Sequence, residues 1–206
     1  MPWASRGRGS SFFPPADPEA RPSLRTLPGN LIAWTAGQIQ SLHPGSFALV
    51  MATGAVSNAL FLEGPRRLSD LLFFANAAAY VWLAGLTIVR AARFPGVMWS
   101  DLVNPCLVFA FFSFVAATGV FGEGAYVRGL TTTALYLWLV ALLVWLVLIY
   151  VGFAVFAFLN TGQGADVIHG GLLAVVGTES LVILGVAVAP VTKGVGPTVV
   201  LLVHML

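Results

Sequence analysis

Three short stretches of an otherwise apolar chain share one pattern: a valine, any residue, a small residue, a threonine, then glycine or glutamate. They read VMATG, VAATG and VVGTE, and their slim or polar members are Thr53, Gly54, Thr118, Gly119, Gly177, Thr178 and Glu179. In an apolar helix, a threonine hydroxyl can donate to the carbonyl four residues earlier, and small residues let helices approach closely. The same groups could instead leave room for an ion and offer it hydrogen bonds. The pattern fits both packing and pore lining.

The first stretch extends its polar face by one helical turn. Ser46, Thr53 and Ser57 lie seven and four residues apart, which places them on one side of a helix. Ser57 therefore joins Thr53 and Gly54 as a candidate pore-lining residue.

Glu179 is the acid that the sequence places near the middle of an apolar run. A charge at that depth costs about 2.5–3.5 kcal/mol on insertion scales, so it suggests function. Protonated by burial, it could donate a hydrogen bond and couple protons to transport. Alternatively, it points about 100° away from Thr178, given 3.6 residues per turn, and bonds a neighbouring helix.

The other polar residues give no sign of a metal, a cofactor or catalysis. Cys106 is the single cysteine, and HExxH, Cys-x-x-Cys, the Walker phosphate loop and the nucleophile elbow are all absent from the sequence. Asp101 precedes an apolar run and is expected to cap that helix. We therefore expect that the protein is not an enzyme. The lesser alternative is an intramembrane enzyme that uses His43, Asp101 or Glu179.

The composition indicates the elements that carry these residues. Hydrophobic residues make up 58% of the chain and charged residues 9%, against about 25% charged in soluble domains. Only helices and closed β-barrels satisfy every backbone hydrogen-bonding group in lipid. The apolar runs do not alternate apolar and polar residues as barrel strands do, so we expect an all-α polytopic membrane protein. The lipid bilayer is its expected partner. Nucleic acid is not, because the net charge is only +2 and no basic stripe is present.

Five apolar runs approach the length of about 20 residues that crosses the hydrocarbon. They cover residues 46–62, 71–89, 103–122, 130–159 and 171–190. A sixth run, 196–206, is too short to span, so we expect a C-terminally truncated chain with an incomplete transmembrane domain over 45–206. Residues 1–44 are rich in Pro, Arg and Ser and are expected to be disordered or interfacial. The distribution of Lys and Arg favours a cytoplasmic N-terminus.

Three blocks of this sequence resemble the tellurite-resistance/C4-dicarboxylate transporter family, which includes slow-type anion channels and malate permeases. They read LHPGSFALVMATGAVSNAL, DLVNPCLVFAFFSFVAATGVFG and HGGLLAVVGTESLVILG. The resemblance implies ten helices in five hairpins, with the odd helices lining a central pore, of which this chain would form the first half. It also implies a multi-pass protein of the inner or plasma membrane and a homotrimer.

The resemblance further implies transport of small anions such as tellurite, malate, chloride or nitrate. The pore-lining residues would be Thr53, Gly54, Ser57, Thr118, Gly119, Gly177 and Thr178, with Glu179 coupling protons or serving structure. A non-conducting membrane scaffold or remnant is the alternative.

Overall fold

The computed structural model describes residues 43–105, 107–159 and 164–191. The predicted disordered or interfacial segment lies outside these residues except at its last two positions. Cys106 and the partial sixth run, 196–206, also lie outside them.

The described residues form helices connected by short turns. In chain order they are η1 (Pro44–Phe47), α2 (Ala48–Glu63), α3 (Arg66–Arg93), α4 (Pro95–Val103), η2 (Val108–Phe111), α5 (Phe112–Val127), α6 (Thr131–Leu159), α7 (Gly164–Val188) and η3 (Ala189–Val191). Five segments in this part of the chain are long and apolar enough to cross a membrane, namely Pro44–Glu63, Arg66–Arg93, Val108–Val127, Thr131–Phe158 and Gly171–Val188. The predicted all-α polytopic class is confirmed.

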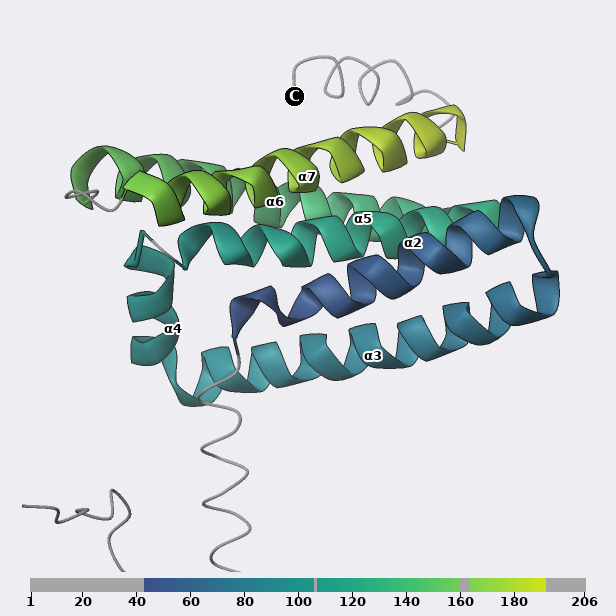
Figure 1. Ribbon diagram of the computed structural model, residues 1–206, viewed down its shortest axis with the longest axis horizontal. Helices are drawn as coiled ribbons and strands as arrows, with labels where there is room; N and C mark the ends of the chain where they lie inside the picture. Colours follow the sequence, from purple (N-terminus) through teal and green to yellow (C-terminus); the bar gives the residue numbers. More distant parts are fainter. Residues whose placement is uncertain (1–42, 106, 160–163, 192–206) are drawn as a thin grey trace, which may run out of the picture. The chain divides into compact units, whose positions relative to one another are not determined.

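The third span differs most from its predicted position. It begins at Val108 rather than near residue 103, and it continues to Val127. Asn104 is extended, with φ −78° and ψ 120°, because the residue before a proline is disfavoured in the helical region. Residues Pro95–Val103 therefore form the separate helix α4, which runs across the ends of its neighbours in Figure 1.

The first, third and fifth spans, called the odd spans below, contain α2, α5 and α7 and pack in a row with α5 in the middle. The second and fourth spans, α3 and α6, are the even spans. Helix α5 contacts both α2 and α7, whereas α3 packs mainly on α2, and α6 packs on α5 and α7 (Figure 1). Of the third span, 72% is buried, against 11–33% of the other spans. Its run of alanine, glycine, serine and threonine allows this close packing, because small side chains let three helices approach one backbone.

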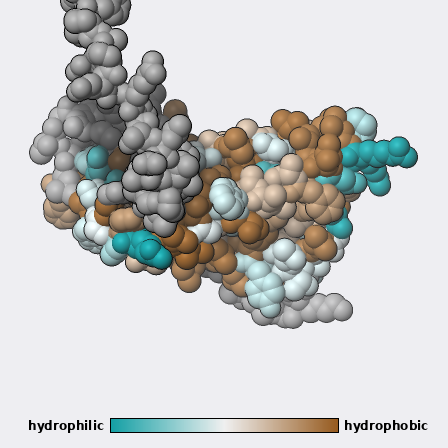
Figure 2. Space-filling model, turned by 90° about the horizontal axis from the view of Figure 1, so that it is seen from below, coloured by the Kyte–Doolittle hydropathy of each residue, from teal (hydrophilic) through white to brown (hydrophobic). Residues whose placement is uncertain are grey.

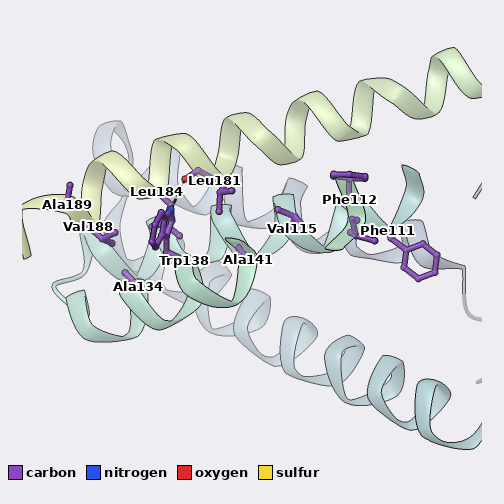
Figure 3. Close-up of a cluster of buried hydrophobic side chains, with 11 residues drawn as sticks. Phe111, Phe112, Val115, Ala134, Trp138, Ala141, Leu181, Leu184, Val188 and Ala189 are labelled. Atoms are coloured by element: carbon purple, nitrogen blue, oxygen red, sulfur yellow. Dashed lines mark hydrogen bonds between the residues drawn. The ribbon is translucent and has the colours of Figure 1, made fainter. Parts of the chain in front are cut away.

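The larger apolar cluster lies between α5, α6 and α7. Trp138 of α6 is buried and donates its indole N–H to the Leu181 carbonyl at 3.0 Å (Figure 3). Phe112 and Val115 of α5 and Leu184 of α7 pack in the same cluster. A buried indole N–H needs an acceptor, and this bond ties α6 to α7 at a fixed register.

The outward faces suit a hydrocarbon solvent. Large apolar side chains such as Trp82, Leu143 and Phe153 are exposed. In Figure 2 hydrophobic side chains cover the middle of the face, and hydrophilic ones lie near its ends. This distribution is the one expected of a multi-pass protein surrounded by lipid.

Candidate functional site

Thr118 lies in the contact between α5 and α3. Its side chain is fully buried and donates to the Phe114 carbonyl at 2.7 Å. Its oxygen is 3.0 Å from the hydroxyl of Tyr80 on α3. Because the threonine proton is used on Phe114, the Tyr80 hydroxyl is the donor in this second bond.

Thr178 has the same arrangement on α7. It donates to the Ala174 carbonyl at 2.9 Å and accepts from the indole N–H of Trp145 on α6 at 2.8 Å. In both cases an aromatic donor on an even span holds the threonine of the odd span that follows it. These contacts are of the packing kind that the pattern also suggested.

Thr53 differs from the other two threonines. It is half-buried, and its hydroxyl makes no hydrogen bond to another described residue. It belongs to the first odd span, so no even span precedes it within the described residues. Its hydroxyl is therefore the one of the three that no described residue engages.

The three candidate glycines lie where odd spans touch their neighbours. A Cβ on Gly54 would lie 2.8 Å from Asn76 Nδ2 and 2.9 Å from a methyl carbon of Val120. A Cβ on Gly119 would lie 3.0 Å from the Ser180 carbonyl oxygen, and one on Gly177 would lie 3.3 Å from backbone and side-chain atoms of Phe112. These distances are below normal contact, so glycine is what allows α5 to approach both α2 and α7.

Ser57 belongs to a hydrogen-bonded group that joins α2, α3 and the end of α5. Ser57 Oγ donates to the Ser69 carbonyl at 2.9 Å, and Ser69 Oγ donates to the Ser57 carbonyl at 2.7 Å. Arg128 Nη2 donates to Ser69 Oγ at 2.6 Å and to Ser57 Oγ at 3.2 Å. Arg128 Nε also donates to Asp70, and Nη1 donates to the Gly124 carbonyl. The sequence pattern does not single out Arg128 as a site residue.

Two acids occupy different surroundings. Glu179 is exposed on α7, beside the half-buried Thr178. Glu123 lies one turn from the end of α5 and is half-buried. The predicted third run ends at residue 122, so the sequence analysis does not single out Glu123. The signal was available, because glycine is common inside membrane helices and does not end them.

His43 and Asp101 are fixed by local structural bonds. His43 caps η1, with Nδ1 accepting from the Gly45 N–H at 3.0 Å. Asp101 does not cap the third span as predicted. It lies in α4 and forms a 2.5 Å ion pair with Arg90 of α3. Among the residues the structure describes, no three His, Cys, Asp or Glu side chains are grouped to hold a metal.

Asn76 and Asn58 carry buried polar atoms that the sequence did not single out. Both polar atoms of Asn76, and Oδ1 of Asn58, are buried without a hydrogen-bond partner among the described residues. Asn58 Nδ2 donates to the Val120 carbonyl at 3.0 Å. Together with Gly54, these amides form a polar seam between α2, α3 and α5.

One comparison with known proteins identifies the chain's relatives. The family model for the voltage-dependent anion channel matches residues 41–206, which include all five spans. No curated protein and no solved structure matches the chain.

Proposed function

The chain belongs to the voltage-dependent anion channel family, and we propose from this premise that it moves small anions across a membrane along a path bordered by α2, α5 and α7. The family match over residues 41–206 carries the proposal. The predicted resemblance to the tellurite-resistance/dicarboxylate transporter family is confirmed by the same match.

The order of the helices supports this path. The three odd spans lie next to one another, and the aromatic donors that hold Thr118 and Thr178 come from the even spans. Such a row can form part of a wall around a path, with the even spans bracing it from outside. The path would be completed by further helices or chains.

The predicted pore-lining residues then divide into two kinds of contribution. Gly54, Gly119 and Gly177 act by letting the odd spans approach. Thr53 offers its hydroxyl to the anion. The remaining predicted residues, Ser57, Thr118 and Thr178, hold the wall together through the bonds described above. Glu179 is exposed on α7 next to Thr178. We propose that its carboxyl group either couples protons to transport or has a structural role.

The cargo proposed is a small anion, with tellurite, chloride, nitrate and a C4-dicarboxylate such as malate as the candidates. We further propose a homotrimer in the inner or plasma membrane with a cytoplasmic N-terminus. No catalytic activity is proposed.

Reconstitution into liposomes tests the function. The purified chain should carry at least one of the four anions faster than protein-free liposomes do, and it should exclude potassium. Thr53→Val should lower this flux without lowering the melting temperature, whereas Thr132→Val on the exposed start of α6 should leave both unchanged. Fluxes equal to those of empty liposomes for all four anions would refute conduction and favour a non-conducting scaffold.

A further inference from the structure

A cavity of about 300 Å³ lies where α3 and α6 flank α5. Phe47, Ala84 and Leu148 contribute to its walls, while Met98 of α4, His43 and Arg90 lie toward one end. Its volume is at the lower limit of the range typical of small-molecule sites, about 300–1,000 Å³. The path proposed above does not use this cavity.

The lining is almost wholly apolar. Thr87 is also part of the wall, but its hydroxyl donates to the Leu83 carbonyl at 2.8 Å and is therefore satisfied within α3. A cavity with so few polar partners does not hold ordered water well. Its favoured occupant is a flexible apolar chain.

The cavity is continuous with the lipid-facing surface. Ile88 lines it and is also 68% exposed, so this side chain lies at the opening. A bilayer acyl chain can enter here sideways, between α3 and α6, without first crossing water.

The polar end of the cavity lies at the membrane boundary. Helix α4 runs across the ends of the spans (Figure 1), and its Trp99 is 64% exposed. Arg90 and Arg93 occupy the last turn of α3. Exposed tryptophan and basic residues mark the headgroup level, which puts His43 beside the lipid phosphates.

The chemistry at this end suits a phosphate. Because His43 Nδ1 accepts from Gly45, the neutral ring carries its proton on Nε2, which is a donor. Arg93 is exposed and forms no ion pair with an acid among the described residues. We propose that the cavity binds one acyl chain of an anionic phospholipid, with the phosphate held by His43 and Arg93.

Photolabelling of the full chain in nanodiscs tests the site. The probe is phosphatidylglycerol with a diazirine on one acyl chain, diluted in phosphatidylcholine, with the labelled residues identified by mass spectrometry. We expect labels on residues near Met98 and Leu148 that saturate as the mole fraction of probe rises. Labelling of the outer faces of α3 and α6 should rise linearly instead.

Matched variants sharpen the result. Ala84→Phe fills the cavity and should reduce the saturable labelling by about fivefold or more, whereas Val81→Phe, one turn earlier on the exposed face of α3, should not. His43→Asn keeps an acceptor for the η1 cap but removes the ring donor, so it should weaken labelling by about threefold.

Three results would overturn the proposal. The first is labelling of the cavity that rises linearly with the mole fraction of probe, a result that the unaltered protein alone can give. The second is saturable labelling that Ala84→Phe leaves intact. The third is a cavity that stays unlabelled at every mole fraction of probe, because the acyl chain would then not enter it.

Discussion

The hydroxyl groups of Tyr80 and Thr118 lie 3.0 Å apart in the buried contact between α3 and α5. The indole of Trp145 holds Thr178 in the same way across the contact between α6 and α7. Two of the three repeated threonines, Thr118 and Thr178, therefore join an odd span to the even span before it. A sequence repeat of helical hairpins corresponds here to a repeated hydrogen bond between the row of odd spans and the helices that brace it.

Removing the Thr118 hydroxyl should destabilise the protein more than removing its partner. In Thr118→Val, the buried Tyr80 hydroxyl loses its acceptor, and we expect a loss of about 1–2 kcal/mol in the free energy of unfolding. Tyr80→Phe should cost less, because Thr118 still donates to Phe114. Unfolding in mixed micelles measures both, and a double-mutant cycle should give a coupling near 0.6 kcal/mol. Strictly additive effects would show that the two hydroxyl groups do not interact.

Gly119→Ala should weaken both packing and transport. The new Cβ would lie 2.9 Å from the Ser180 Cβ and 3.0 Å from its carbonyl oxygen, so α5 and α7 would have to separate. Overpacking of this kind costs about 1–3 kcal/mol. We expect a lower melting temperature and a lower anion flux in liposomes.

Gly85→Ala is the matched control for that substitution. Apart from the adjoining residues and backbone of α3 itself, no atom lies within 4 Å of a Cβ at Gly85, so stability and flux should stay the same or rise slightly. If both alanines have the same effect, helix propensity rather than the α5–α7 contact determines the result.

Arg128→Met should loosen the first hairpin from α5. The guanidinium bonds both Ser57 and Ser69 and also stacks on Phe73, with 4.2 Å from its carbon to the ring centroid. Losing a mostly buried charged donor with several partners should cost about 2–4 kcal/mol. Arg128→Lys should recover only part, because an ammonium cannot reproduce the planar fork.

Hydrogen exchange should show where the structure loosens. Faster exchange in α2 near Ser57 and in α3 near Ser69 is expected for Arg128→Met. Arg66→Met is the control, because Arg66 is exposed and only lies over Phe61 at 5.2 Å. An equal acceleration in both variants would contradict the role assigned to Arg128.

The fold class, and the number of spans among the residues that the structure describes, could be predicted from sequence because hydrocarbon thickness sets the length of an apolar run. The third span was misplaced because the polar residues before it do not start that span. Asp101 lies in the separate helix α4, and the chain is extended at Asn104, before Pro105. The same error placed Glu123 in a connection, although α5 continues past it to Val127.

The partners of the candidate residues could not be predicted. Thr118 meets Tyr80 only because α3 and α5 adopt one relative rotation, and no local sequence pattern encodes that rotation. Asn76 was overlooked for the same reason. Its neighbours in FANAAAY suggest an ordinary apolar helix face, and the close approach of Gly54 from α2 to its amide is visible only in the structure.

The ion pair between Arg90 and Asp101 should be the main restraint on α4. Only 5% of the Arg90 side chain and 18% of the Asp101 side chain are exposed, and the charged atoms are 2.5 Å apart. Asp101→Asn removes the carboxylate that the buried Arg90 guanidinium bonds, which should cost about 3–5 kcal/mol. Because α4 covers one end of the phospholipid cavity, the saturable photolabelling near Met98 should also fall in this variant.

Asp70→Asn is the control for Asp101→Asn. Asp70 is 52% exposed in its pair with Arg128, so this substitution should cost at most about 1 kcal/mol. Melting temperature and tryptic cleavage after Arg93 measure the difference, and similar losses in the two variants would show that the buried pair does not hold α4 in place.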